Sequence, residues 1–200
     1  IAATKQIKYA KSLGMTVIVT DHHEIPYERD GENRQWILPE ADAIVNHKQW
    51  DCGYPFKELC GAMVAYQLIA ALNEEMGLGK NEVRKLLPYG ALATVCDVME
   101  LKGENRIIVK EGIEAFKTNS DVGINALIKE CALDKRNLSA YHFGFVIGPC
   151  LNASGRLDTA KKAFELLVSI DANRADELAV KLKKLNDERK ELTEKSAKEA

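Results

Sequence analysis

Two strand signals near the start, followed by helical patterns, predict an α/β fold: a parallel-sheet domain truncated at its N-terminus, a helical region and a long C-terminal helix. Residues 1–13 have the apolar spacing of an amphipathic helix, and Gly14 is expected to end that helix. The β-branched run that follows predicts a buried strand over 15–20. A second short strand is predicted over 42–46. A helix that leads into a buried strand implies an earlier parallel strand. Because Ile1 is also not a methionine, we expect a fragment whose first strands are missing.

The remaining segments follow from local patterns. Residues 24–39 are expected to form a polar loop, and 139–156 to begin apolar and end in a loop rich in Gly, Pro, Asn and Ser. Pro88 predicts a kink or a fresh helix start. The other helices are expected over 60–72 (buried on most sides), 82–98, 105–116, 123–131 (with Ser120 or Asp121 as N-cap) and 159–170.

These patterns divide the chain into three parts. Residues 1–100 are expected to be the C-terminal part of the α/β domain, and 101–171 its helical continuation, which carries a candidate nucleic-acid-binding loop. The charged segment 172–200 is expected to be a solvated helix that connects to a missing C-terminal domain, in preference to a coiled coil.

Composition and charge are those of an ordinary soluble globular protein. Apolar residues make up 46% of the chain, charged residues 29%, and the net charge is −2, so a nucleic-acid partner would need a local positive surface. The five cysteines are odd in number and form no Cys-x-x-Cys pair, which indicates reduced thiols in a cytoplasmic protein. The apolar runs are too short to cross a bilayer, so we expect no membrane partner.

An acid and two imidazoles, Asp21, His22 and His23, end the first predicted strand. Ligands bind at the carboxyl ends of strands in α/β sheets, so this cluster predicts a divalent-metal site. Adjacent residues on an extended chain point to opposite sides, so one imidazole would ligate a metal and the other would meet the substrate. Asp21 would then orient an imidazole through its second nitrogen. The alternative is a solvent-exposed strand end with incidental histidines.

Asp97 is a second candidate. At helical spacing Gly90 shares its face, and apolar neighbours such as Val95 and Val98 would make an uncompensated carboxylate costly to bury. A metal or another cation is a natural compensation. The alternative is an aspartate at a helix C-terminus that is hydrogen-bonded to the backbone.

The stretch 148–156 is a third candidate site. Small residues such as Gly155 let the backbone approach a ligand, Asn152 and Ser154 offer hydrogen bonds, and Arg156 offers a bidentate donor to phosphate. The alternative is a connecting loop in which the arginine pairs with Asp158. Two further histidines are weaker candidates: His47 follows a strand end, and His142 is expected to be packed and hydrogen-bonded.

Five motifs occur in a recognisable order: Val-Thr-Asp21-His22-His23-Glu, Asp42-Ala-Ile-Val-Asn46-His, Leu59-Cys-Gly61-Ala, Gly90-Ala-Leu-Ala-Thr-Val-Cys-Asp97-Val-Met and Ile147-Gly-Pro-Cys-Leu-Asn152-Ala-Ser-Gly-Arg156-Leu. They resemble the DHH phosphoesterase superfamily and, within it, the RecJ-type single-strand-specific exonucleases, over roughly residues 1–170. The triad is shared with pyrophosphatases and small-nucleotide phosphodiesterases, whereas the Gly-Pro-x-x-Asn-Ala-x-Gly-Arg stretch resembles the RecJ type.

The resemblance implies a Mn²⁺- or Mg²⁺-dependent, two-metal hydrolysis of single-stranded DNA in the 5′-to-3′ direction, in DNA repair and recombination. It implies that His22 and Asp97 are metal ligands, that His23 contacts the scissile phosphate, and that Asp21 supports the histidines. Arg156 is implied to bind a terminal 5′-phosphate. The residues implied to bind the DNA strand are Asn152, Ser154, Gly155 and Arg156.

Some parts of the family pattern lie outside this sequence: an early Asp-x-Asp motif, an aspartate expected just before Ile1, and a C-terminal domain with a glycine- and histidine-rich motif. We therefore expect the intact protein to be the nuclease and this piece alone to be inactive. Two alternatives stay open: a DHH-family oligoribonuclease or cyclic-dinucleotide phosphodiesterase, and a non-catalytic binding module. Repair proteins are candidate partners, and the sequence leaves the oligomeric state open.

Overall fold

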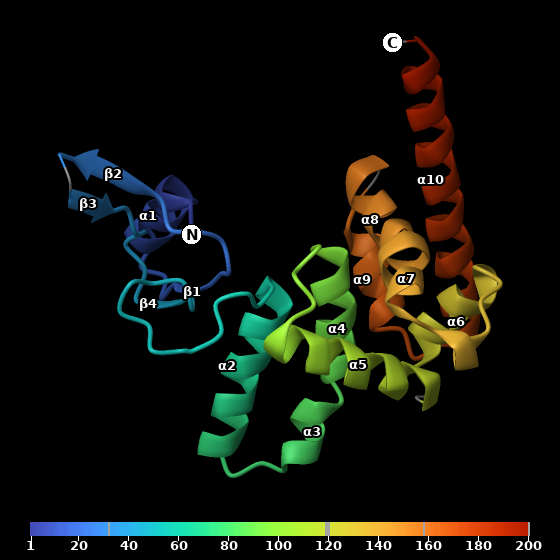
Figure 1. Ribbon diagram of the computed structural model, residues 1–200, viewed down its shortest axis with the longest axis horizontal. Coiled ribbons are helices and arrows are strands. Elements are labelled where there is room, and N and C mark those ends of the chain that lie inside the picture. Colours follow the sequence, from blue (N-terminus) through green and yellow to red (C-terminus); the bar gives the residue numbers. More distant parts are fainter. Residues whose placement is uncertain (32, 119–120, 158, 200) are drawn as a thin grey trace. The chain divides into compact units, whose positions relative to one another are not determined.

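A computed structural model of the chain describes residues 1–31, 33–118, 121–157 and 159–199 (Figure 1). The side chains of Asn33, Lys80, Arg156 and Glu199 lie outside the description. The chain forms two compact units, Ile1–Ile108 and Val109–Ala200. The predicted boundaries near 100 and 171 stay predictions.

The first unit begins with the helix and the two parallel strands that the sequence predicts. Helix α1 (Thr4–Ser12) ends before Gly14, whose φ of +78° is a conformation that favours glycine. Strand β1 (Ile18–Thr20) pairs in parallel with β4 (Ala43–Val45), with Thr20 opposite Val45. The carboxyl ends of both strands therefore lie side by side, and this edge carries the predicted metal cluster.

The expectation that the first strand is buried is wrong. Ile18 is 61% exposed, and no side chain of α1 is fully buried. Within the described residues β1 pairs with β4 alone, and a two-stranded sheet is too narrow to be covered on both faces.

The expected polar loop over 24–39 contains an antiparallel hairpin, so this prediction is also corrected. Strand β2 (Tyr27–Asp30) pairs with β3 (Asn33–Trp36), from Tyr27 opposite Trp36 to Asp30 opposite Asn33. Gly31 in the connection has a φ of +63°. A glycine that opens a two-residue connection is a hairpin signal, but the strands themselves are too polar to show the usual apolar alternation.

Helices make up the rest of the first unit. Of the two outcomes predicted for Pro88, a kink or a fresh helix start, the structure shows the helix start. Proline fits the first turn of a helix. Met63 and Val64 are buried, but Ile69 and Leu72 are 42% and 52% exposed, so the helix expected to be buried on most sides is only half-buried. The helices are α2 (Gly61–Glu75), α3 (Lys80–Arg84), α4 (Leu87–Cys96) and α5 (Gly103–Thr118), which spans the boundary between the units.

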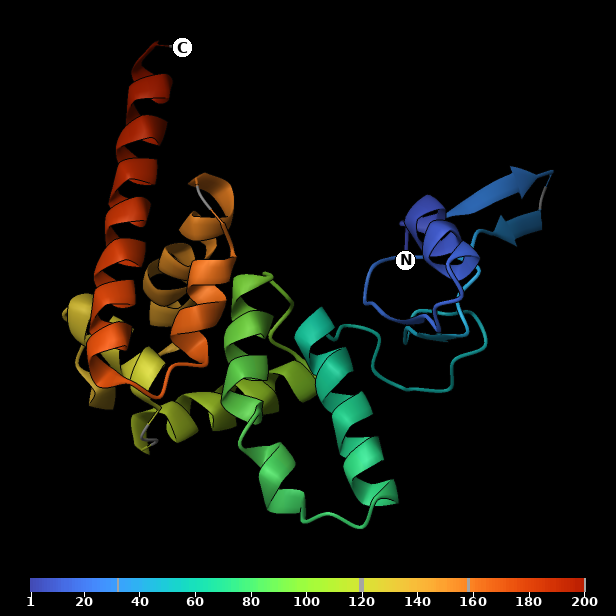
Figure 2. The same cartoon turned by 180° about the vertical axis from the view of Figure 1, so that it is seen from behind.

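The second unit is helical. Its elements are α6 (Val122–Glu130), a 3₁₀ turn (Lys135–Asn137), α7 (Ala140–His142), a π-helical turn (Phe143–Ile147), α8 (Gly148–Leu157), α9 (Lys161–Leu167) and α10 (Ala172–Glu199). Asp121 caps α6 by accepting a hydrogen bond from the Ile124 amide, as one predicted alternative has it, and Ser120 lies outside the described residues. The first half of α10 packs against α6, α8 and α9 (Figures 1 and 2), and its Leu178 and Leu182 are fully buried.

The stretch expected to be a Gly/Pro/Asn/Ser-rich loop is helix α8, so this prediction is wrong. Cys150, Ala153 and Ser154 are fully buried and share one helical face, which packs near α10. Glycine, proline and asparagine lower helix propensity, but small side chains let helices approach closely, and packing decides the structure here. Within the described residues, no helix is both long and apolar enough to span a membrane.

Candidate active site

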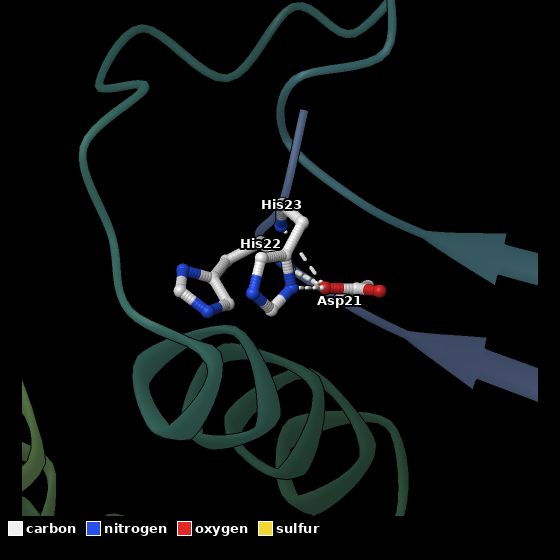
Figure 3. Close-up of side chains that lie close together, drawn as sticks. All are labelled: Asp21, His22 and His23. Atoms are coloured by element: carbon white, nitrogen blue, oxygen red, sulfur yellow. Dashed lines mark hydrogen bonds and ion pairs between the residues drawn. The ribbon is translucent and has the colours of Figure 1, made fainter. Parts of the chain in front are cut away.

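The carboxyl end of β1 brings Asp21, His22 and His23 together (Figure 3). The Asp21 amide still donates to the Val45 carbonyl at 3.0 Å, so the cluster begins where the parallel pairing ends. One potential ligand atom from each of the three side chains lies within 4.8 Å of the others. The sequence placed the cluster at this strand end, and the structure places it there too.

Asp21 organises the cluster through one carboxylate oxygen. Its Oδ1 accepts hydrogen bonds from the amides of His22 (2.7 Å) and His23 (3.0 Å) and from the His23 ring nitrogen Nδ1 (2.7 Å). Its Oδ2 contacts the backbone nitrogen of Ile1. Burial alone would raise the pKa of Asp21, but the hydrogen bonds from Ile1, His23 and His22 outweigh it and hold the pKa well below its ordinary value.

The bond to Asp21 fixes the orientation and tautomer of His23. A carboxylate only accepts hydrogen bonds, so Nδ1 of His23 carries the proton of this bond, and Nε2 is the ring nitrogen that does not bond to Asp21. The His23 side chain is 72% exposed, which leaves Nε2 available to a substrate. Asp21 therefore orients an imidazole, as predicted, and the imidazole is that of His23.

His22 faces a different set of neighbours. Its Nε2 lies 3.4 Å from Oδ2 of Asp97, which caps the C-terminus of α4. The His22 side chain is only 16% exposed, and its ring lies against Gly61 at the start of α2. A β-carbon at Gly61 would come within 3.3 Å of Cδ2 of His22, so the missing side chain leaves room for this ring.

Asp97 is more open than the sequence suggests. Its side chain is 47% exposed, and Val98, expected to help bury it, is 88% exposed with a φ of +57°. The helix ends at this point, so the residues after it turn away from a helical face. The Asp97 amide donates to the Ala93 carbonyl at 2.9 Å, as expected at a helix end, while its carboxylate oxygen Oδ2 faces Nε2 of His22.

His22 and Asp97 fit a divalent metal by their chemistry. A neutral imidazole nitrogen and a carboxylate oxygen are both ligands that Mn²⁺ takes in proteins, and a carboxylate suits Mg²⁺. Two ligands bound at about 2.1 Å can lie up to roughly 4 Å apart, so the observed 3.4 Å is compatible with one shared ion.

Asn46 supports the cluster and was missed as a site residue. It is 2% exposed at the end of β4, and its amide nitrogen donates to the His23 carbonyl at 2.9 Å. Its amide oxygen accepts from the Lys48 amide at 2.8 Å. The signal was available, because Asn46 ends the strand that was expected to lie beside the first one.

The remaining histidines lie outside the cluster. His47 is buried and donates through Nε2 to the Lys57 carbonyl at 2.8 Å, and burial lowers its pKa. It lines a cavity of about 250 Å³ together with Tyr54 and Gln67. In α7, Nδ1 of His142 accepts from the Ser139 amide at 3.1 Å, so this histidine is hydrogen-bonded, as expected.

The predicted nucleic-acid residues all lie on α8 in the second unit, but not on one face. Asn152 and Gly155 are exposed and one helical turn apart. Ser154 is fully buried and donates to the Leu151 carbonyl at 3.0 Å. The side chain of Arg156 and all of Asp158 lie outside the description. The roles of these residues in binding stay predictions.

Residues 1–96 match the DHH family, N-terminal domain. The whole chain is 40% identical over 200 residues to the single-stranded-DNA-specific exonuclease RecJ of Bacillus subtilis, of which it covers 24%. It is 36% identical over 202 residues to the protein of the same name from Escherichia coli, matching with 96% of this chain and 33% of that protein.

The fold is similar to that of a solved RecJ. The crystal structure of RecJ from Thermus thermophilus in complex with Mn²⁺ matches all of this chain with a TM-score of 0.80 and 31% identity. The chain covers 28% of that structure, and about a quarter to a third of these relatives altogether.

Proposed function

The chain belongs to the DHH family, and from this premise we propose that it is part of a metal-dependent exonuclease that degrades single-stranded DNA in the 5′-to-3′ direction, in repair and recombination. The observation that carries the proposal is the 3.4 Å approach of His22 to Asp97 beside the carboxylate-oriented His23. These ligands come from two separate elements that meet at one sheet edge. The exonuclease names of the relatives supply the reaction class.

In the proposed reaction, His22 and Asp97 hold a Mn²⁺ or Mg²⁺ ion. When bound, such an ion lowers the pKa of water and stabilises the charge that develops on the phosphate. Asp21 holds the His23 ring in one orientation, so that His23 presents Nε2 to a phosphate oxygen of the scissile bond. A protonated Nε2 would donate a charge-assisted hydrogen bond to that oxygen.

We propose that α8 contacts the DNA strand. Asn152 and Gly155 share an exposed helical face, where an amide side chain and an accessible backbone suit a sugar-phosphate chain. Arg156 is the proposed ligand of the 5′-phosphate because a guanidinium binds phosphate in a bidentate manner. Ser154 stays in the proposed set, with a buried hydroxyl that supports the helix.

The proposed setting follows from the substrate. The relatives are bacterial exonucleases, and bacterial DNA lies in the cytoplasm, so we propose a cytoplasmic location. Repair proteins that generate or protect single strands are the proposed partners.

The test uses the intact protein that contains this chain, Mn²⁺, and a 5′-phosphorylated single-stranded oligonucleotide. His22→Ala and Asp97→Asn each remove one proposed ligand and are expected to lower the cleavage rate by about 1,000-fold, since metal catalysis contributes several kcal/mol. The matched control is Asp51→Asn, which changes an exposed aspartate and is expected to cleave at the wild-type rate.

Three other outcomes would contradict the proposal. Faster cleavage of dinucleotides than of long strands would indicate an oligoribonuclease or a cyclic-dinucleotide phosphodiesterase. An intact protein without metal-linked cleavage of any nucleotide would indicate a binding module. Unchanged rates in His22→Ala and Asp97→Asn would show that the metal is held elsewhere.

A further inference from the structure

The register of the β2–β3 hairpin sorts its side chains by chemistry onto two faces. Tyr27 pairs with Trp36 and Arg29 with Arg34, and these two pairs are two residues apart on each strand. Side chains two residues apart in a strand point to the same side, so these four share one face. The acidic side chains of β2, Glu28 and Asp30, alternate with them and project to the other side.

Aromatic rings on the first face form a continuous cluster. The ring centroids of Tyr27 and Trp36 lie 5.3 Å apart in an edge-on arrangement. Trp50, from the turn after β4, stacks on Trp36 with a centroid distance of 5.7 Å and an interplanar angle of 14°. Trp50 is 57% exposed and Tyr27 is 37% exposed. Trp36 is thus the half-buried centre of the cluster, and its neighbours offer rings to solvent.

Two guanidinium groups border these rings. The Cζ atom of Arg34 lies 4.7 Å from the Tyr27 ring centroid, a cation–π distance. A hydrogen bond from Arg29, together with the charge of Arg34, lowers the pKa of Tyr27. Among the described residues, neither guanidinium is paired with a carboxylate, so a phosphate could bind them without displacing an acidic partner.

We propose that this aromatic–arginine face (Tyr27, Arg29, Arg34, Trp36 and Trp50) binds single-stranded nucleic acid, with bases stacked on the exposed rings and phosphates at the guanidinium groups. The proposal rests on the proposed nuclease function and assigns it a further substrate-binding surface. Stacking platforms bordered by positive charge are a general solution for binding unpaired strands, because every base has a π-face. The occupant is the substrate strand, away from the bond that is cut.

The place of the face in the chain supports this occupant. The hairpin begins four residues after His23, and the turn that carries Trp50 begins after β4, whose end lies beside the metal cluster. The cluster and this face therefore belong to the same unit, and the guanidinium groups of the face complement the phosphate charge of a strand. The acidic opposite face repels phosphates, so the two faces should differ sharply in their effect on binding.

The binding test uses the intact protein with EDTA, which prevents cleavage, and a fluorescent 5′-phosphorylated oligo-dT whose anisotropy reports the Kd. Trp50→Leu keeps apolar bulk but removes the stacking ring and is expected to weaken binding about 10-fold, while Trp50→Phe should retain most of the affinity. Arg34→Ala should also weaken binding and reduce the salt dependence by about 0.7 in log–log slope. The matched control, Gln35→Ala on the opposite face, should bind like the wild type.

An abasic oligonucleotide separates stacking from a purely structural role. Without bases to stack, Trp50→Leu and the wild type should bind the abasic strand equally well. A misfolded hairpin would instead lower the affinity of Trp50→Leu for both oligo-dT and the abasic strand. Equal oligo-dT affinity of wild type, Trp50→Leu and Arg34→Ala, in a protein that still cleaves single strands, would overturn this inference and leave the proposed function intact. A wild-type protein that neither cleaves nor binds single-stranded DNA would overturn both the proposed function and this inference. Preference of this face for an acidic peptide over oligo-dT would replace the nucleic acid with a protein partner and overturn the inference.

Discussion

Replacing Gly123 by alanine is expected to destabilise the second unit strongly. Gly123 lies in the first turn of α6, where the chain passes very close to the end of α9. A β-carbon at this position would lie 1.9 Å from the carbonyl oxygen of Leu166 and 2.8 Å from its carbonyl carbon. Both atoms belong to the backbone, and Leu166 is fully buried, so no side-chain rotation can relieve the overlap.

The magnitude follows from two opposing effects. Alanine is a better helix former than glycine by up to about 1 kcal/mol. Forcing an extra carbon into a packed interior costs about 1–3 kcal/mol, and the upper end applies where the backbone must move. Separating the β-carbon and the carbonyl oxygen to an ordinary contact requires a shift of more than ~1 Å between two helices. We therefore expect Gly123→Ala to lower the free energy of unfolding by about 2 kcal/mol or more.

Urea denaturation followed by helical circular dichroism measures this change. The matched control is Gly155→Ala in α8, where the new β-carbon would lie 3.7 Å from the Ala160 Cβ, an ordinary contact. Without a clash, the control should be unchanged or more stable by up to about 1 kcal/mol. If Gly123→Ala is as stable as Gly155→Ala, the close approach of α6 to α9 is not a constraint and the reasoning fails.

Three further experiments test local features of the structure. Asp121→Ala removes the N-cap of α6 and should cost about 1 kcal/mol in urea denaturation, whereas an equal stability would show that the cap contributes nothing. Cys131 should react with iodoacetamide faster than Cys150 at pH 8, because the hydrogen bond between the thiols lowers the pKa of Cys131 and raises that of Cys150. Peptide mass spectrometry gives the order in which the two cysteines are alkylated. Faster alkylation of Cys150 would contradict the prediction. Gly61→Ala should displace the His22 ring by a few tenths of an ångström and weaken Mn²⁺ binding to the intact protein a few-fold by calorimetry; unchanged affinity would show that the ring position is not set there.

Local signals carried the parts of the fold that were predicted correctly. The β-branched run before Asp21 and the second run before Asn46 became the two parallel strands, and Pro88 began a helix, because each signal acts within a few residues. The hairpin depends instead on contacts that are distant in sequence. Trp36, whose ring is at the centre of the cluster, packs on Trp50, which follows β4 in the sequence. The sequence of the hairpin alone does not contain this partner.

Helix α8 shows the opposite failure. Its glycines, proline and asparagine predict a loop when they are counted one by one. Their helical spacing places Cys150 and Ala153 on one buried face, where small side chains allow close packing. Tertiary packing therefore overrides propensity. The same face turns Ser154 inward, so a list of polar residues could not tell which members of this stretch point to solvent.

The candidate site was predictable in its members and not in its pairings. Adjacent histidines must differ in environment, but only the fold determines which neighbour each one receives. His23 obtains Asp21 from its own chain turn and Asn46 from the parallel strand, so its ring and its backbone are both held. His22 obtains Asp97 from a helix end and is confined by Gly61. The two imidazoles are therefore not interchangeable: the one beside a second carboxylate is suited to a metal, and the exposed one, whose proton is fixed by Asp21, is suited to a phosphate.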